Sequence, residues 1–221
     1  MRRQLLPALR MVVVLTVALG LVYPLVILGI SQVAFKSKAN GSLIEKNGQV
    51  VGSALIGQTF SADQYIQGRP SAAGITASGS TDAAGQPGDP SDLSLSNTGG
   101  SNLGPTNPVL LDGTIGDPTV DPEKQAPGIT QRVSAYRLAN GLADDVKVPV
   151  DAVTSSGSGV DPGISVANAR LQAARVARVR GIDVSVVDQL IDQNTTSRSL
   201  GFLGEATVNV LGLNLALDAR P

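Results

Sequence analysis

The sequence predicts an α+β protein in which a single N-terminal transmembrane helix is followed by a mixed α/β extracytoplasmic domain. Three observations support this fold class. Residues 11–35 form a run of 25 residues without a charged side chain, which is long enough as a helix to cross the roughly 30 Å hydrocarbon core of a bilayer. An Asn-Gly pair at residues 47–48 lies between apolar runs, a pattern typical of a β-hairpin. Helical patterns with capping residues dominate from residue 130 onward.

The apolar run begins at Met11 and still includes Val33. A cleaved signal peptide is the alternative, but its apolar core is about 7–15 residues long and ends in a small-x-small site. Residues 31–35 match such a site poorly, so we expect an uncleaved anchor. Tyr23-Pro24 lies in mid-span. A simple kink and a neighbouring protein helix that satisfies the freed carbonyl both explain a proline there.

Charges on either side of the run predict its orientation. Three arginines precede it and three lysines follow within residues 36–46, so the positive-inside rule gives a modest preference for residues 1–10 in the cytoplasm and residues 36–221 outside. From residue 39 onward, 12 basic and 18 acidic side chains leave a net charge of −6. Such an acidic body argues against nucleic acid as a partner and against close binding of anionic lipid.

The first half of the domain is predicted to contain few regular elements. Residues 42–56 fit a hairpin closed by the Asn-Gly turn, and residues 61–67 fit one short helical turn. Residues 74–98 consist almost entirely of Gly, Ser, Ala, Thr, Asp and Pro. Because such a composition buries too little apolar surface to offset its ordering entropy, we expect a disordered insertion there. Residues 112–128 are predicted to be a second soft segment.

Capping residues delimit three predicted helices. The first spans Thr130–Asn140, with Thr130 as its cap and Gly141 as its stop. The second runs from Ser165 to Arg180 and ends before a glycine suited to the C′ position.

Asp183 caps the third helix, which continues to Gln193 with an apolar stripe on one face. In the C-terminal tail, residues 208–217 alternate as a strand would, but they also place apolar residues at helical spacing. Local pattern therefore leaves both interpretations of the tail open.

Missing residue types exclude several kinds of chemistry. The chain has no histidine and no cysteine, which removes an imidazole base, a Ser-His-Asp triad and a thiol nucleophile. It also lacks a P-loop motif and the Asp-Lys-Thr-Gly sequence that is phosphorylated in P-type pumps. Asp144-Asp145 is interpreted as a solvated surface. The arginines of residues 170–180 suit a helix C-terminus, and a basic face for an acidic partner is the alternative.

Three loops rich in Gly, Ser, Asn and Pro have the most unusual composition: residues 68–74, 99–108 and 153–162. Small residues permit positive φ and close backbone approach, and Asn and Ser side chains bond to nearby backbone. By this mechanism alone the loops are either structural turns or an anion-binding nest.

These loops and three further motifs resemble, in the same order, the C subunit of the Kdp potassium-transporting P-type ATPase. The further motifs are Gly-Ser-Ala-Leu-Ile-Gly-Gln at 52–58, Gln-x-x-Arg-Val-Ala at 172–177 and Val-Asn-Val-Leu-x-Leu-Asn-Leu-Ala-Leu-Asp at 208–218. The resemblance extends from the anchor to the C-terminus. The insertion is longer than in the compact form of the family, and Gly163 stands where many members have a histidine.

The resemblance implies a non-catalytic accessory subunit of an ATP-driven potassium uptake complex. Its implied partners are a channel-like A subunit, an ATP-hydrolysing B subunit and a small F subunit, and the implied role is to support assembly and to raise the ATP affinity of the pump as a catalytic chaperone. No cofactor is expected on the chain itself; ATP belongs to the complex and potassium is the transported ion. An extracytoplasmic domain cannot meet cytosolic ATP, so we expect an effect through subunit packing. A membrane-tethered envelope hydrolase or binding module is the alternative.

The resemblance also identifies candidate structural or subunit-contact residues. Arg69 is the foremost, because its planar fork between Gly68 and Pro70 suits carboxylates and carbonyls. We expect it to hold the neighbouring Gly-Ser-Asn loop, with contact to a partner subunit as the alternative. The full set is Arg69, Pro70, Ser71, Ser101, Asn102, Asn107, Thr154, Ser156, Ser158, Asp161, Gln172, Arg175, Asn209 and Asn214.

Overall fold

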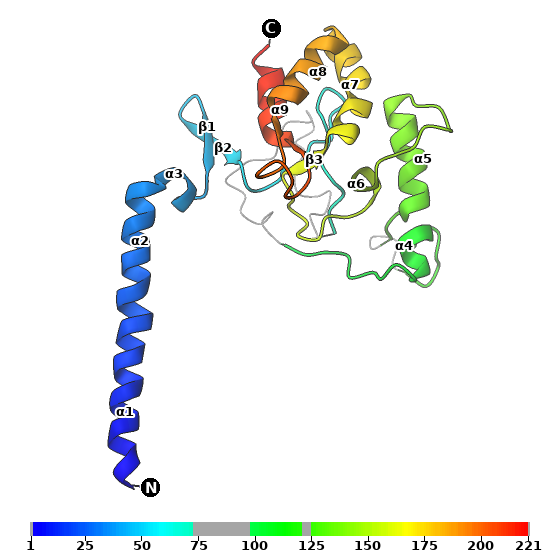
Figure 1. Cartoon of the computed structure of the whole chain (residues 1–221). Coiled ribbons are helices and arrows are strands. Elements are labelled where there is room, and N and C mark those ends of the chain that lie inside the picture. The colour runs from blue at the N-terminus through cyan, green and yellow to red at the C-terminus, as the bar shows by residue number, and fades with distance from the viewer. Residues whose placement is uncertain (1, 73–97, 121–124, 221) are drawn as a thin grey trace. The chain divides into compact units, whose positions relative to one another are not determined.

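The computed structural model describes residues 2–72, 98–120 and 125–220 and combines helices with short strands, which confirms the predicted mixed fold class (Figure 1). The chain divides into two compact units, residues 1–43 and 44–221, and each is described by itself. All of the predicted insertion at residues 74–98 except residue 98 lies outside the described residues.

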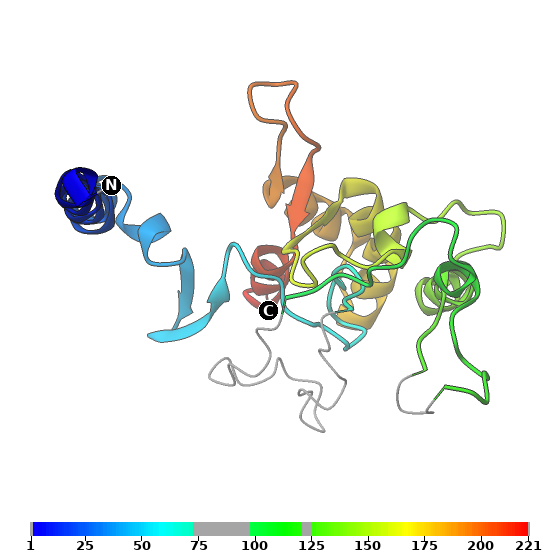
Figure 2. The same ribbon diagram turned by 90° about the horizontal axis from the view of Figure 1, so that it is seen from below.

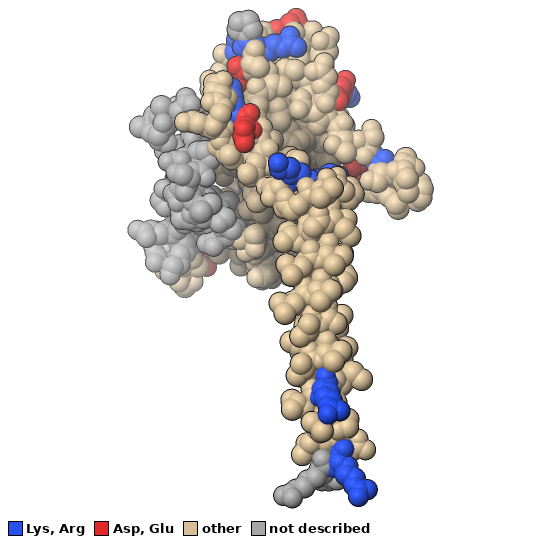
Figure 3. All heavy atoms as spheres, turned by 90° about the vertical axis from the view of Figure 1, so that its left-hand side faces the viewer, with Lys and Arg blue, Asp and Glu red and all other residues tan. Residues whose placement is uncertain are grey.

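The first unit is an apolar helix built from α1 (Arg2–Val17), the π-helical turn η1 (Ala18–Val22) and α2 (Tyr23–Ala34), followed by the short α3 (Lys36–Ala39). Its apolar stretch, Arg3–Ala34, is long and apolar enough to span a membrane. Basic side chains lie near both ends of this stretch (Figure 3). The predicted anchor is thus a helix, and it begins well before Met11.

The helix stays continuous through Tyr23-Pro24 because its turn widens there. Pro24 has no N–H to donate, and the amide of Tyr23 bonds to the carbonyl of Ala18, five residues earlier. The side chains of Met11, Tyr23 and Val33 are all exposed within the chain itself. The predicted break is therefore a π-turn, and nothing within the described chain covers it.

The predicted hairpin comes next along the chain. Strands β1 (Leu43–Lys46) and β2 (Gln49–Ser53) pair in a two-stranded sheet. Asn47 and Gly48 have φ values of 53° and 77°, the left-handed conformation that such a turn requires at both positions. Residues 61–67 were predicted to be a helical turn, but they contain no helix. They form a bend with one hydrogen bond between their own backbone groups, from the Tyr65 amide to the Ala62 carbonyl.

Helix α4 (Pro108–Asp112) was not predicted, and α5 (Ile129–Asn140) begins earlier than predicted. Gly128, not Thr130, is its N-cap: the Gly128 amide donates to Gln131 Oε1 at 2.6 Å. A Cβ at residue 128 would lie 2.3 Å from the Gly113 nitrogen, so close backbone approach requires glycine there. The predicted stop at Gly141 is confirmed by its φ of 64°.

The predicted soft segment 112–128 is tied together wherever the structure describes it. The Thr114 amide donates to the Ala126 carbonyl, and the Ala126 amide donates back to Thr114 Oγ1, both at 2.9 Å. Residues 121–124 lie outside the described residues. These bonds join residues 12 positions apart, beyond the reach of a local pattern.

The remaining elements form the centre of the domain. They are α6 (Val150–Val153), β3 (Gly163–Ser165), α7 (Val166–Arg180), α8 (Val184–Gln193), β4 (Thr195–Thr196), β5 (Thr207–Asn209) and α9 (Val210–Asp218). The predicted caps Ser165 and Asp183 accept bonds from Asn168 N and Ser185 N. The strands form an antiparallel sheet of order β3-β5-β4, with Ile164 opposite Val208.

The ambiguous tail contains both predicted states. Val208 is buried in β5, and the chain then enters α9 with Asn209 as the cap: its Oδ1 accepts from Gly212 N at 2.8 Å. Leu213 and Leu217, four residues apart, are fully buried on the inner face of that helix. The core consists mainly of Val, Leu, Ile and Ala side chains from α7, α8, α9 and the sheet. Figure 1 shows α7, α8 and α9 gathered together.

Candidate functional site

The serine-rich loop 153–162 is the place where the sequence-predicted loops meet. Its Ser156 amide donates to the Pro70 carbonyl at 2.9 Å, and its Ser158 carbonyl accepts from the Gly99 amide at 2.8 Å. A Cβ on Gly100 would lie 3.1 Å from the Gly157 carbonyl oxygen, so glycines let the two backbones approach. Segments 68–70 and 99–100, far apart in sequence, are therefore attached to one loop.

The side chains of this loop bond mainly to its own backbone. Ser156 Oγ accepts from the Gly159 amide at 3.1 Å, and Ser158 Oγ accepts from the Val160 amide at 3.2 Å. Asp161 Oδ1 accepts from the Gly163 amide at 3.0 Å. Because these amides are already satisfied, the arrangement favours structural turns over an anion-binding nest.

Arg69 joins the chain to this loop from the other side. Its Nη1 lies 3.1 Å from Asp161 Oδ2, and its Nη2 donates to the Ser155 carbonyl at 3.3 Å. Its buried Nε has no hydrogen-bond partner among the described residues. The Arg69 guanidinium thus holds the serine-rich loop. The expectation that it would hold the Gly-Ser-Asn loop 99–108 was wrong. The neighbouring bond from Ser156 to Pro70 explains this choice, since it brings the two segments together.

A second group of candidate residues lies inside the domain, around Arg175. This side chain is only 1% exposed. Its Nε donates to Asn140 Oδ1 at 2.9 Å and its Nη2 donates to the Tyr65 carbonyl at 3.1 Å, while Nη1 bonds to the Asp63 carbonyl. Burial lowers the pKa of the Arg175 guanidinium, and the nearby Asp63 carboxylate opposes that shift.

Contacts within the domain correct the basic-face interpretation of the arginines on α7, whereas Arg178 and Arg180 do lie in the last turn of the helix, as the other interpretation expected. Arg175 points into the protein, and Arg180 bonds to the Gln64 carbonyl and to Asp218, each at 2.7 Å. Arg170 pairs with Asp192 at 2.9 Å. These arginines therefore join elements of the domain and do not form a basic face.

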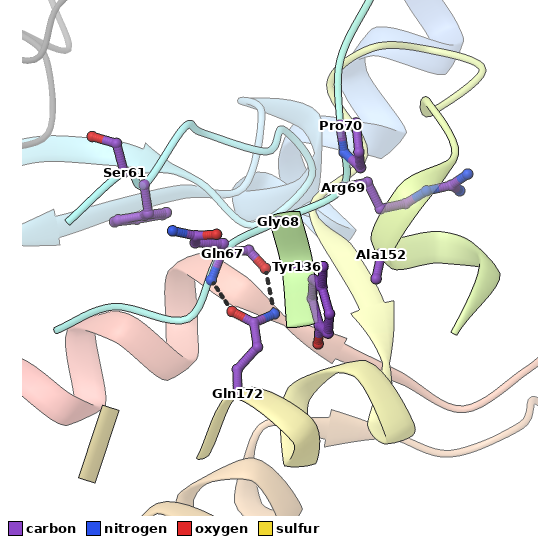
Figure 4. A pocket seen from close by; sticks show the side chains of 9 residues that line it. Ser61, Gln67, Gly68, Arg69, Pro70, Tyr136, Ala152 and Gln172 are labelled. Carbon is purple, nitrogen blue, oxygen red and sulfur yellow. Dashed lines mark hydrogen bonds between the residues drawn. The ribbon is translucent and has the colours of Figure 1, made fainter. Parts of the chain in front are cut away.

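Gln172 and Asn214 hold the same segment by its backbone. Gln172 accepts from the Gln67 amide at 2.8 Å and donates to the Gln67 carbonyl at 3.1 Å (Figure 4). Asn214 does the same to Ile66, with both bonds at 2.9 Å. Each amide supplies one donor and one acceptor, as a neighbouring strand would. Residues 66–67 are consequently fixed to α7 and α9 without being part of a sheet.

Three candidate residues stabilise the ends of helices. Asn107 Oδ1 accepts from the Val109 amide at 3.0 Å and so caps α4. Asn209 caps α9 and also donates to the Ala54 carbonyl at 3.0 Å. Thr154 Oγ1 donates to the Val150 carbonyl at 2.7 Å at the end of α6.

The other candidates shape turns. Ser101 Oγ accepts from the Leu103 amide at 3.4 Å, and Asn102 between them has a φ of 55°. Ser71 is half-buried directly after Pro70. The candidate set therefore does not form one site: part of it meets at the serine-rich loop and part clamps residues 63–67.

Sequence reasoning missed Asn168, Tyr136 and Asp151, which extend the buried network. Asn168 Oδ1 accepts from Gln172 Nε2 at 2.9 Å and from the Tyr136 hydroxyl at 2.8 Å, and its Nδ2 donates to Asp151 at 3.1 Å. Burial raises the pKa of the Tyr136 phenol, with the Asp151 charge as a smaller cause. A signal was present, because Asn168, Gln172 and Arg175 share one helical face with the small apolar residues of α7.

Two shallow hollows border Arg69. One, of about 340 Å³, is lined by Gln67, Tyr136 and Gln172, among others; the other, of about 380 Å³, is lined by Asp161, Thr207 and Glu205, among others. Figure 4 shows the Arg69 side chain pointing away from the Gln67–Gln172 pair. No group of three or more potential metal ligands occurs in the part of the chain that the structure describes.

Comparison with known proteins agrees with the resemblance seen in the motifs. The family model described as "K+-transporting ATPase, c chain" matches residues 5–219. A potassium-transporting ATPase KdpC subunit of Mycobacterium tuberculosis (strain H37Rv) is 51% identical over 218 residues, covering 99% of both chains. KdpC subunits of Koribacter versatilis and Rhodospirillum rubrum are each 44% identical, covering 99% and 100% of this chain and 95% and 97% of their own. The chain therefore belongs to the KdpC family, the c chains of K+-transporting ATPases.

Proposed function

We propose that this chain is the non-catalytic accessory subunit of an ATP-driven, high-affinity potassium uptake complex. Its partners are the channel-like A subunit, the ATP-hydrolysing B subunit and the small F subunit. The family match over residues 5–219 carries this proposal. The site geometry supports it, because Arg69, Asp161 and Arg175 are engaged in bonds within the domain. Potassium and ATP then belong to the complex, and this chain contributes to assembly.

The effect on ATP is exerted through subunit packing. We place residues 1–10 in the cytoplasm and the domain outside, as the arginines before the apolar run favour. Cytosolic ATP does not reach a domain on that side. The subunit therefore raises the ATP affinity or the coupling of the B subunit as a catalytic chaperone, by holding its membrane neighbours and the outer entrance of the ion in a competent arrangement.

Purification of the pump with and without this chain tests the proposal. An affinity tag on the C-terminus of the chain is expected to bring down the A and B subunits, and the chain alone is expected to show no potassium-stimulated ATP hydrolysis. Pump purified from a strain without the chain is expected to need more ATP for half-maximal turnover. Hydrolysis by the isolated chain, or purification without any pump subunit, would refute an accessory role.

Orientation is tested separately, using the absence of cysteine from the natural chain. A single cysteine at the exposed Asp144 (Asp144→Cys) is expected to react with a membrane-impermeant maleimide in intact spheroplasts. The matched variant Gln4→Cys is expected to react only after lysis. The reverse pattern would place the domain in the cytoplasm, where it would be able to bind ATP directly.

A further inference from the structure

Asparagine is followed directly by glycine at residues 40–41, 47–48 and 140–141. Such a pair undergoes a reaction that needs no enzyme. The amide nitrogen of the second residue attacks the side-chain carbonyl carbon of the asparagine, and glycine leaves that path unobstructed because it has no Cβ. How fast the reaction runs in a folded protein depends on whether the fold restrains these two groups.

The Asn47-Gly48 pair is the least restrained of the three. Both residues are exposed, and among the described residues no hydrogen bond involves the Asn47 side chain or the Gly48 amide. A Cβ on Gly48 would meet nothing within 4 Å, so the turn is surrounded by solvent. Figure 1 and Figure 2 both show this turn, in light blue, apart from the helices of the domain.

The Asn140-Gly141 pair is held on both sides. Asn140 is only 4% exposed. Its Oδ1 accepts from Arg175 Nε and its Nδ2 donates to the Tyr136 carbonyl, both at 2.9 Å. The Gly141 amide donates to the Leu138 carbonyl at 3.2 Å. Attack requires both reacting groups to leave these bonds, so the fold protects this pair.

The Asn40-Gly41 pair is exposed but hydrogen-bonded. Asn40 Nδ2 donates to the Lys36 carbonyl at 2.7 Å and to Gln32 Oε1 at 3.1 Å. The Gly41 amide donates to the Lys38 carbonyl at 3.2 Å. Because water has access to these bonds, they open more readily than buried ones and give this pair partial protection.

The end of the hairpin must open before Asn47 reacts. Ring closure requires the Asn47 backbone to leave the left-handed conformation of the turn, in which its φ is 53°. A two-stranded hairpin is only marginally stable by itself in water, and the flanking residues 45–46 and 49–50 are all exposed. Opening of this end therefore costs little free energy compared with opening of a buried segment.

We propose that Asn47 is a site of spontaneous deamidation, which reacts faster than Asn40 and far faster than Asn140. The Gly48 nitrogen forms a bond to Asn47 Cγ, and its proton leaves with the side-chain nitrogen as ammonia. Water then opens the cyclic imide at either carbonyl and leaves aspartate or isoaspartate at residue 47. Both products add a negative charge, and isoaspartate also lengthens the backbone of the turn, which alters the register of β1 with β2.

Comparison of the folded and the denatured full chain tests the proposal. The chain in detergent and the same chain denatured in urea are held at mildly alkaline pH, digested, and analysed by mass spectrometry for the products of all three pairs. In urea the three pairs are expected to react at similar rates, since glycine follows each asparagine. Folding is expected to slow Asn47 by no more than about tenfold and Asn140 by about a hundredfold or more.

Asn47→Gln is the matched control for the assignment. Glutamine retains the amide but closes a larger ring much more slowly, so the product at the hairpin is expected to disappear while the other two pairs keep their rates. Persistence of that product in the variant, equal protection of Asn47 and Asn140 in the folded parent chain, or faster reaction at Asn40 would overturn the proposal. The reaction needs only this chain and water, so its outcome is independent of the proposed function.

Discussion

Gln172 and Gln67 lie 105 residues apart in sequence and are joined by two hydrogen bonds: the side-chain amide of Gln172 accepts from the Gln67 backbone amide and donates to the Gln67 backbone carbonyl. The Gln67 backbone therefore finds, in a side chain of α7, the donor and acceptor that a paired strand would provide. Asn214 of α9 repeats the arrangement one residue earlier, at Ile66. Segment 63–67 is thus an integral part of the domain although it has no regular secondary structure.

Replacing Gln172 by leucine is expected to lower the free energy of unfolding of the full chain in detergent by about 2–3 kcal/mol, because the Gln67 amide and carbonyl and one Arg175 nitrogen lose a buried partner. Denaturant titration measures the change. Gln189→Leu makes the same substitution at an exposed position of α8 and is expected to change little. Equal losses for both variants would contradict the importance of the clamp.

Arg175→Lys retains a positive charge but removes the fork that reaches Asn140, Tyr65 and Asp63. We expect the free energy of unfolding to fall by about 3 kcal/mol or more, since a buried charge is left with fewer partners. Hydrogen exchange at the amides of residues 66 and 67 is expected to accelerate. Arg178→Lys, at an exposed position on the same helix, is the control; similar acceleration in that variant would show that the effect is not specific to the network.

Arg69→Lys is expected to weaken the attachment of residues 68–70 to the serine-rich loop. The side chains of Arg69 and Asp161 are 25% and 35% exposed, so solvent screens the pair. The free energy of unfolding is therefore expected to fall by only about 1 kcal/mol. Assembly or domain stability falls, while ATP turnover per assembled pump stays nearly unchanged. Arg170→Lys, in the more exposed pair with Asp192, is the control. Full assembly with collapsed turnover would assign the loop a part in the reaction cycle.

Residues 74–97 are expected to be replaceable by a short Gly-Ser linker with growth on limiting potassium retained. The flanking Pro70 and Gly99 attach to Ser156 and Ser158, whose α-carbons are no more than about 7 Å apart. A short linker therefore bridges the ends, and changing loop length alters the closure entropy by only about 0.6 kcal/mol per doubling. The protein level and growth rate are measured together, with a same-length segment of shuffled order as control. Lost growth at a normal protein level would show that the order of these residues matters.

Features specified by neighbouring residues were predictable. The Asn47-Gly48 turn, the caps Ser165 and Asp183 and the stop at Gly141 all act on backbone groups within a few residues, and an apolar run of fixed length identifies the membrane-spanning candidate. In each case the residue type itself carries the information, as a conformational preference or as a side-chain oxygen at the right spacing. The order of motifs likewise identified the family.

What the sequence alone determined is therefore the anchor, the hairpin, three helices and the family; the tertiary structure decided which polar groups meet. Nothing near Arg175 in sequence indicates that its guanidinium binds the backbone of residues 63–65, and nothing near Gly128 indicates that contact with Gly113 requires glycine there. Such bonds depend on how α7, α9 and the loops pack. A local pattern records the preferences of one segment, whereas the satisfaction of buried polar groups depends on segments more than a hundred residues apart.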